Sequence, residues 1–336
     1  MRRVLLAVML SGCAGEADWV LQDGVSPPSE LPESRPLRLS RFTAVSDGLP
    51  AGAEVRSTAH LDGTLYAVVE ANGRRSLFAL EGGQSVWKSA GPTLRPGEEP
   101  QALTRLDVAV YLTAADFAGG KGSVHKLEFS DEGWSRLSAP DAPARVLTKK
   151  TGALLLAVGG DAPSAGLYAS ADRGKTWTQR SSAAFLAHAT ALAASPAAAR
   201  MFATGDVALG FGKLYHSDDA GATWAESTLA GEVGALSASA EFVLVQVRGE
   251  GTWRSDNYGN TFHPVALEGV AQSFFTTGPK AFAGTSLGVR VSDDGGRSWR
   301  DASDGLPSGV EVKNLYLAGS SLFAASRGAV FVAAVE

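Results

Sequence analysis

The sequence predicts an all-β fold in which one structural unit is repeated around a ring, and three observations support this prediction. Glycine occurs 39 times among 336 residues and recurs with Pro, Asp and Ser between short apolar runs. This distribution is typical of many short strands joined by tight turns. An eight-residue motif recurs along the chain, and a five-residue motif near one end recurs near the other.

The composition is that of a globular protein. Hydrophobic residues make up 45% of the chain and charged residues 19%, which supplies a large core and too little charge for disorder. The length could give two average domains, although all-β folds of this size commonly form one. The formal net charge is −5, without a cluster of Lys and Arg. We therefore expect no binding of nucleic acid.

The N-terminal residues have the pattern of an export signal. Arg2 and Arg3 precede an apolar run at residues 4–10, which is too short to span a bilayer. The following Leu-Ser-Gly-Cys sequence is similar to the lipobox of bacterial lipoproteins. That resemblance implies a signal peptide at residues 1–12 and lipid attachment at Cys13, the one cysteine of the chain. The protein would then be anchored to a membrane of the bacterial cell envelope, facing the periplasm or the cell surface. A chance cysteine in an ordinary signal is the alternative.

A tether and one large domain follow the cysteine. Residues 13–36 are rich in Pro and Ser and show no apolar period, so we predict a stiff, extended tether. Repeats begin after it, and residues 37–336 are predicted to form the folded body.

Four segments, at residues 170–177, 217–224, 255–262 and 292–299, share the pattern S-x-D/N-x-G-x-T/S-W/F. The Asp or Asn can bond the backbone two residues on, and the Gly can supply a positive φ, so each segment is predicted to form a hairpin turn. Its aromatic residue would pack between neighbouring sheets. The pattern resembles the Asp-box, or bacterial neuraminidase repeat, of sialidases, sortilin-type receptors, photosystem II assembly factors and xyloglucan hydrolases.

Weaker copies complete the series of repeats. Residues 130–134 keep the turn and the aromatic residue, and residues 82–87 keep only the end of the motif. The six closing aromatic residues lie 37 to 47 residues apart, which is the spacing of propeller blades. The sequence Ser-Asp-Gly-Leu-Pro occurs at residues 46–50 and again at 303–307, which makes Phe42 a seventh aromatic.

The two ends of the chain are predicted to close the ring together. Residues 300–336 supply three strands without a closing motif, and residues 37–43 would add the fourth strand. We therefore predict a single seven-bladed β-propeller whose N-terminal strand completes the last blade and removes a free sheet edge.

One segment favours a helix by propensity. Residues 183–200 are rich in Ala and Leu. The repeat register instead places an inner strand at residues 189–195, a turn beginning at Pro196 and the next strand at residues 201–204. We predict these strands, with a helical turn near Pro196 as the alternative.

The motifs that suggest chemistry are incomplete. Residues 284–288 match G-x-S-x-G, but a strand follows them where a helix is required. Residues 174–176 imitate a phosphate-binding loop without its first Gly. The five histidines lack paired metal-site spacing, and the acidic pairs at 218–219 and 293–294 lack the closing Glu of a calcium loop. We predict turn capping by these acids, and neither a metal nor a cofactor.

The resemblance to sialidases implies three arginines, a Tyr and Glu pair and an Asp acid. The family has Arg-Ile-Pro before its first blade, whereas residues 41–43 here are Arg-Phe-Thr. Tyr168 and Tyr215 share a repeat position with Trp253 and are predicted to pack rather than to react. Arg290 occupies the same position in blade 6 and would either reach solvent or bind an anion. Xyloglucan hydrolases use two tandem propellers, and this chain has residues for one.

We therefore expect a non-catalytic, membrane-anchored platform that binds or helps to assemble a protein, peptide or glycan, with an exo-sialidase-like glycoside hydrolase as the alternative.

The turns between second and third strands would lie opposite the motif turns, and they are long at residues 114–122, 159–166 and 204–212. We predict that these three turns form a raised wall, although neutral loop growth would give the same lengths. The predicted ligand-binding residues are Asp116, Phe117, Lys121, Asp161, Asp206 and Phe211.

Overall fold

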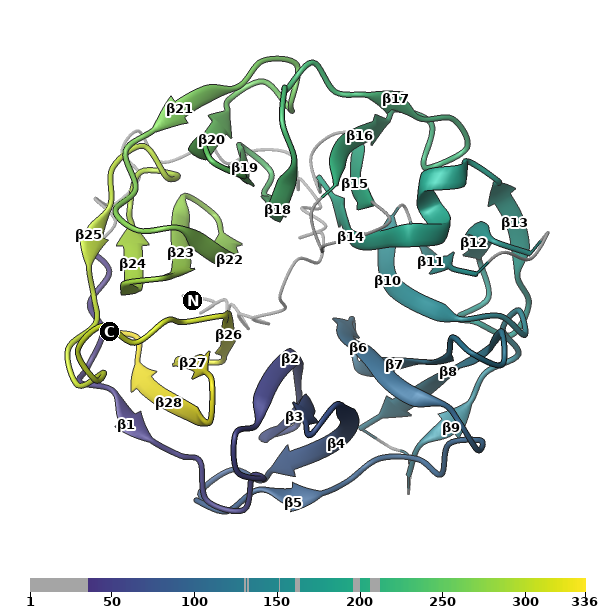
Figure 1. The fold of residues 1–336 in the computed structure, drawn as a ribbon, viewed down its shortest axis with the longest axis horizontal. Coiled ribbons are helices and arrows are strands. Elements are labelled where there is room, and N and C mark those ends of the chain that lie inside the picture. Colours follow the sequence, from purple (N-terminus) through teal and green to yellow (C-terminus); the bar gives the residue numbers. More distant parts are fainter. Residues whose placement is uncertain are drawn as a thin grey trace, which may run out of the picture.

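The protein is a ring of seven β-sheets around a central axis (Figure 1). The computed structural model describes residues 36–129, 131, 133–150, 152–160, 164–195, 200–205 and 212–336. Each sheet has four antiparallel strands, numbered from the axis outward in chain order within blades 1 to 6. The predicted all-β class and the seven-bladed propeller are therefore confirmed.

The strands of the first three blades have these bounds. Blade 1 contains β2 (Glu54–Leu61), β3 (Thr64–Ala71), β4 (Arg74–Leu80) and β5 (Lys88–Ser89). Blade 2 contains β6 (Glu99–Leu106), β7 (Ala109–Asp116), β8 (Lys121–Glu128) and β9 (Ser135–Arg136). Blade 3 contains β10 (Ala144–Lys150), β11 (Ala153–Val158), β12 (Gly166–Ser170) and β13 (Thr178–Ser181).

The remaining blades follow the same order until the last. Blade 4 contains β14 (Ala189–Ala194), β15 (Met201–Gly205), β16 (Lys213–Ser217) and β17 (Ala225–Glu226). Blade 5 contains β18 (Val233–Ala238), β19 (Val243–Val247), β20 (Gly251–Ser255) and β21 (His263–Val265). Blade 6 contains β22 (Ala271–Thr277), β23 (Lys280–Thr285), β24 (Gly288–Ser292) and β25 (Arg300–Asp301). Blade 7 contains β26 (Asn314–Ala318), β27 (Ser321–Ser326), β28 (Ala329–Ala334) and β1 (Thr43–Ala44).

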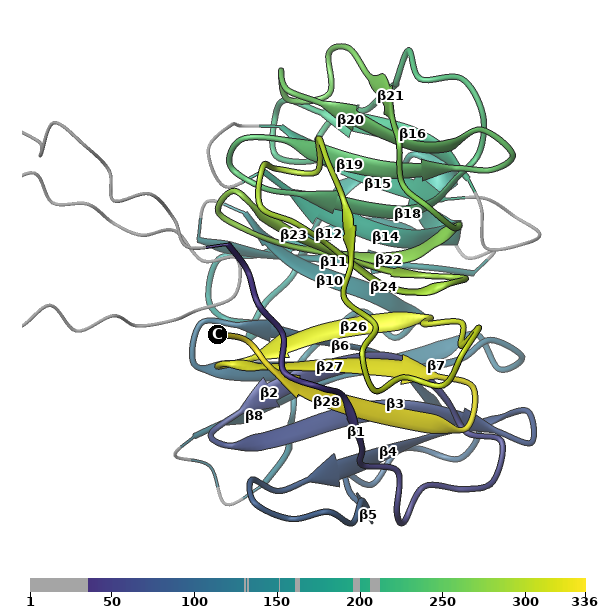
Figure 2. The ribbon, with the colours of Figure 1, turned by 90° about the vertical axis from the view of Figure 1, so that its left-hand side faces the viewer.

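The N-terminal strand closes the ring as predicted. β1 pairs antiparallel with β28, with Thr43 opposite Val332 (Figure 2). An isolated bridge joins Leu39 to Val335 and extends the contact. Leu37 and Phe42 are buried in the apolar cluster between blades 6 and 7. Residues from the two ends of the chain therefore share one sheet and one core.

The hydrophobic core lies between neighbouring blades. The clusters combine residues of adjacent sheets, and the closing aromatic residues take part in them as expected: Trp177 packs on the cluster between blades 2 and 3, and Trp224 on the one between blades 3 and 4. Each blade buries both faces against its neighbours, which fixes the positions of the innermost strands around the axis.

The four motif segments form turns of one design, which we call the box turns (residues 170–177, 217–224, 255–262 and 292–299). In the second, Ser217 Oγ accepts the Gly221 N–H at 2.8 Å. Asp219 accepts the N–H of Thr223 at 2.8 Å and its hydroxyl at 2.6 Å. The Asp thus reaches four residues along the chain, further than the two residues predicted. Gly221 has φ +87°, and a Cβ there would lie 2.4 Å from Leu167 Cδ2, so other residues fit poorly.

The box turns predict that the protein loses stability in acid, and that an Asn in place of the Asp reduces this loss. The Thr223 hydroxyl lowers the pKa of Asp219 to about 2. A carboxyl with a depressed folded pKa adds stability that is present above its unfolded pKa and is lost as the pH falls through about 2. The third box turn uses Asn257, which accepts the Thr261 N–H at 2.9 Å and donates to its hydroxyl at 2.8 Å.

We therefore expect Asp219→Asn to melt close to the wild type at pH 7. Between pH 4 and pH 2 its melting temperature should fall by about 2 °C less than that of the wild type. Calorimetry across this pH range provides the measurement. An equal decline in the two proteins would contradict this account of the turn.

The Ala-rich segment is mostly strand, as the repeat register predicts. β14 and β15 occupy the predicted places. A short 3-10 helix, η1 (Ala184–His188), precedes β14 and buries Leu186 and Ala187. The helical turn considered near Pro196 falls outside the described residues. Within the ranges given above, no helix is both long enough and apolar enough to cross a membrane.

Candidate binding site at the channel mouth

A ring of unpaired backbone positions surrounds one end of the central channel. Six of the seven innermost strands are interrupted near their start by a β-bulge, and the residue displaced from the pairing is polar in five of the six. Bulges of this kind turn a side chain away from the regular pattern of the sheet. The displaced residues are Arg56, Gln101, Arg145, Thr190, Gly234 and Gln272. Lys313 stands at the equivalent position just before β26. We call these seven residues the mouth ring.

The mouth ring lies on the propeller face opposite the box turns. Glu54, at the start of innermost strand β2, pairs with Glu70, at the end of β3, so the starts of the inner strands share a face with the turns between second and third strands. A cavity of about 890 Å³ opens there. Five mouth-ring residues and Phe117 line it, and aliphatic side chains extend inward from them: Ala102, Leu103, Val146, Leu147, Ala191 and Leu192.

On the blade 1 side of the mouth, cations and anions are matched. Glu70 Oε2 accepts Nε of both Arg56 and Arg75 at 3.0 Å. Glu54 lies 2.9 Å from Arg56 Nη2 and 2.8 Å from Lys313 Nζ. The hydrogen bond from Arg56 lowers the pKa of Glu70, and that from Lys313 lowers the pKa of Glu54. This part of the rim is a closed ion-pair network.

The blade 3 side differs because Arg145 forms no ion pair with any described residue. Its guanidinium carbon lies 4.8 Å from the centre of the Phe117 ring. Its Nε is shielded from solvent and has no hydrogen-bond partner in the part of the chain that the structure describes. Burial lowers the pKa of Arg145, and no acidic group of the described residues offsets this effect. The Phe117 side chain, in turn, is 50% exposed.

Hydrogen bonds from side chains join the strands of neighbouring blades around the mouth. Ser57 Oγ accepts the Leu103 N–H of the next blade at 2.9 Å. Thr104 donates to the Leu147 carbonyl at 3.0 Å, and Thr113 donates to the Arg145 carbonyl at 2.7 Å. These bonds join blades 1, 2 and 3 and hold the Arg145 backbone in place, so the cavity is largely preformed.

A buried charge network supports the neighbouring hairpin. Glu98, with a side chain that is 1% exposed, accepts Arg95 Nη2 at 2.6 Å and Ser123 Oγ at 3.0 Å. Arg95 also donates to the Gly122 carbonyl at 2.6 Å and to Asp141 at 2.7 Å. The network fixes the base of β8 against the segment that leads into blade 3.

The predicted ligand-binding residues are only partly brought together at this site. Asp116, the last residue of β7, pairs with Lys121, the first residue of β8, so the predicted wall of blade 2 is an extended hairpin. Asp116 Oδ1 accepts the Gly119 N–H at 2.8 Å and caps this turn, and Lys121 is exposed. Of these three, Phe117 lines the cavity. The others, Asp161, Asp206 and Phe211, lie outside the described residues.

Arg145 was missed by the motif search because it belongs to no motif. Alignment of the inner strands alone would have found it, because one repeat position is polar and directly follows an apolar residue in six blades: Arg56, Gln101, Arg145, Thr190, Gln272 and Lys313. That signal marks the ring, but it does not distinguish the paired cations from the unpaired one.

The residues considered for sialidase chemistry have packing roles. Tyr168 packs on the cluster between blades 2 and 3, and Tyr215 stacks on Phe185 with ring centres 3.8 Å apart. Arg290 is buried and contacts Glu268 at 3.0 Å and Asp301 of the outermost strand β25. It neither reaches solvent nor lines the channel mouth.

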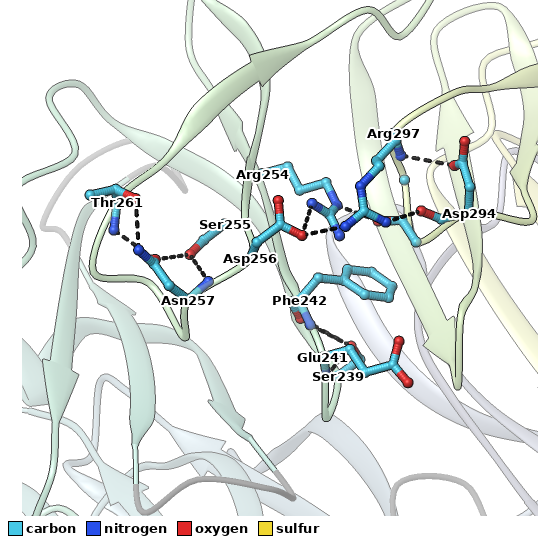
Figure 3. A network of polar contacts seen from close by, with 12 residues as sticks. Ser239, Glu241, Phe242, Arg254, Ser255, Asp256, Asn257, Thr261, Asp294 and Arg297 are labelled. Atoms are coloured by element: carbon cyan, nitrogen blue, oxygen red, sulfur yellow. Dashed lines mark hydrogen bonds and ion pairs between the residues drawn. The ribbon is translucent and has the colours of Figure 1, made fainter.

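On the opposite face, polar contacts link the box turns of blades 5 and 6 (Figure 3). Arg254 donates to the Gly295 carbonyl at 2.5 Å and lies 5.2 Å from the Phe242 ring centre. Arg297 reaches Asp256 of the neighbouring turn at 2.7 Å. These contacts join blades 5 and 6. Nowhere in the described ranges are three His, Cys, Asp or Glu side chains grouped as metal ligands.

Comparisons with known proteins reveal a similarity in fold alone. No protein-family model and no curated protein matches the chain. Among solved structures, YCF48 from Cyanidioschyzon merolae aligns over 88% of this chain and 98% of its own, with TM-score 0.62 and 12% identity. YCF48 bound to D1 peptide aligns over 90% and 98%, with TM-score 0.62 and 14% identity. The fold is that of these propellers. An inactive virginiamycin B lyase from Staphylococcus aureus, bound to quinupristin, aligns over 89% and 98%, with TM-score 0.59 and 9% identity.

Proposed function

We propose that this chain is an exported, lipid-anchored propeller of the bacterial cell envelope that binds a peptide segment of a partner protein at the channel mouth, without catalysis. The observation that carries the proposal is the preformed cavity of about 890 Å³, with the half-exposed Phe117 at its border. A concave site of this size with one exposed aromatic residue is typical of ligand recognition. The peptide in the YCF48 complex supports a peptide as the kind of ligand.

The charges of the rim favour binding over glycoside hydrolysis. A glycosidase needs a carboxylic acid whose pKa is raised so that it can protonate the leaving group. At the mouth, Arg56 and Lys313 have the opposite effect and lower the pKa values of Glu70 and Glu54. These two acids are therefore suited to hold the rim together rather than to donate a proton.

The position of the chain entry supports an anchored platform. The Leu37 N–H donates to Asp293 Oδ1 at 2.8 Å, and Asp293 belongs to the fourth box turn. The tether predicted at residues 13–36 would therefore join the propeller on the face opposite the mouth. A lipid at Cys13 would leave the cavity open to a partner.

Filling the cavity tests this function. Thr190 is an exposed mouth-ring residue, and Thr190→Trp places an indole in the cavity. We expect the labelled mature protein to bind members of an array of random decapeptides, and Thr190→Trp to weaken that binding about 10-fold or more. The affinity is measured by fluorescence anisotropy on the retained peptides.

Lys175→Trp is the matched control, because Lys175 is exposed on a box turn at the opposite face. It should bind as the wild type does, and both variants should melt within a few degrees of the wild type. Undiminished peptide binding by a folded Thr190→Trp protein would place the site elsewhere. A wild-type protein that retains no peptide would disprove the peptide function itself.

A further inference from the structure

We propose that the peptide is recognised through a carboxylate, which Arg145 binds, next to an aliphatic residue that enters the cavity. This inference rests on the proposed function and specifies the chemistry of its ligand. It starts from a difference in charge around the mouth. Arg56, Arg75 and Lys313 each contact a glutamate of the rim, whereas Arg145 contacts none among the described residues.

The surroundings of Arg145 make an unpaired charge costly. The Gly159 backbone passes so near that a Cβ there would lie 2.2 Å from Arg145 Nε, and this nitrogen is shielded from water without a hydrogen-bond partner among the described residues. A partly buried cation whose Nε is shielded loses hydration at that nitrogen, and only a new partner can replace it. A ligand carboxylate would restore the lost interaction, so the site is prepared for a negative charge before the ligand arrives.

The contact of Arg145 with Phe117 is compatible with a carboxylate at the edge of the guanidinium. The ring lies 4.8 Å from the guanidinium carbon, and such an aromatic contact uses the flat face of an arginine. The N–H donors of a guanidinium lie in its plane, where they match the two oxygens of a carboxylate. Phe117 and the ligand can therefore contact Arg145 at the same time.

Among the described residues, the other polar side chains that line the cavity already have hydrogen-bond or ion-pair partners. Glu70 holds Arg56 and Arg75, Arg75 bonds Gln101, and the Thr190 hydroxyl lies 2.9 Å from that of Thr204. A glycan would need many free donors and acceptors, whereas the described part of the cavity offers one cation without an ion-pair partner, and aliphatic side chains such as Leu147 and Leu192. This combination suits a peptide carboxylate with an apolar neighbour better than a sugar.

The decapeptide array distinguishes the source of the carboxylate. One set has a free C-terminal carboxylate and no Asp or Glu, a second has a C-terminal amide and one central Glu, and a third has the amide and no acid. We expect the wild-type protein to bind the first or the second set at least 10-fold more tightly than the third. The preferred set tells whether a chain end or a side chain supplies the carboxylate.

Variants assign the effect to Arg145. Arg145→Gln should weaken binding of the acidic peptides about 10-fold or more and should bind the third set as the wild type does. Arg145→Lys should recover part of the loss, because a lysine keeps the charge without the paired donors. Arg74→Gln is the control, since Arg74 is a highly exposed cation next to the same rim, with a side chain that is 86% exposed. It should change the affinity less than 2-fold.

The outcomes separate this inference from the proposed function. Equal binding of all three sets, still blocked by Thr190→Trp, would overturn the role of Arg145 and leave peptide binding intact. Absence of binding to every set would overturn both. Binding of oligogalacturonate, an acidic glycan, in place of the peptides would show that the carboxylate belongs to a sugar and would refute the peptide as its source.

Discussion

Deletion of residues 37–44 is expected to lower the melting temperature by more than about 10 °C or to prevent folding. The deletion removes β1 from β28 and takes Leu37 and Phe42, which are almost fully buried, out of the cluster between blades 6 and 7. Each of these side chains contributes about 1.5–3 kcal/mol through burial. The strand also covers the edge of β28, which would otherwise be free to pair with another molecule. Differential scanning calorimetry and light scattering measure the two effects.

Deletion of residues 14–30 is the control for this experiment, since it shortens the predicted tether and leaves the closing strand in place. It should leave the melting temperature unchanged within about 1 °C. A second variant separates the strand from its side chains: Phe42→Ala should cost about 3–5 kcal/mol while β1 stays paired. If the two deletions gave equal thermal stability, the closing role of the N-terminal strand would be wrong.

Replacement of Cys13 by alanine is expected to release the protein from the membrane fraction completely. In cells, the wild type should incorporate a radiolabelled fatty acid and sediment with membranes, and Cys13→Ala should do neither. Several acyl chains hold a protein far more firmly than the marginal affinity of one chain. Cell fractionation with fatty-acid labelling makes the measurement.

The anchor experiment also tests whether attachment and binding are independent. Because the chain enters the propeller at Leu37, next to Asp293 on the box-turn face, the loss of the lipid should not alter the mouth. Cys13→Ala should therefore melt and bind array peptides like the wild type. A wild-type protein without fatty-acid label would end the lipoprotein hypothesis, whatever the peptide results are.

A rigid ring suits the proposed role because its binding residues come from several blades. Arg145 is supplied by blade 3 and Phe117 by blade 2, and Thr113 ties these blades together through the Arg145 carbonyl. A site held by such contacts needs little reordering when a ligand binds, which saves conformational entropy. The affinity should then depend on the side chains at the mouth more than on a conformational change during binding.

The sequence by itself determined the repeat number and the closure of the ring, because both are encoded by short-range or repeated patterns. A box turn is made within eight residues, by bonds such as those of Asp219 to Thr223, so it can be recognised locally. The repeated Ser-Asp-Gly-Leu-Pro showed where the first strand belongs, and β1 is found beside β28. The repeat register also placed β14 and β15 correctly against the helical propensity of that segment, since packing between blades outweighs local preference.

Only the tertiary structure decided which polar residues form the candidate site. Asp116 was predicted as a ligand contact on the basis of its loop, and the structure shows its carboxylate capping that loop at Gly119. Arg290 and Arg145 are each the single arginine of their strand, yet Arg290 meets Glu268 and Asp301 while Arg145 meets Phe117. Whether such a cation finds an anion depends on side chains contributed by other strands and blades. Sequence position does not reveal those distances, and the packing of the blades sets them.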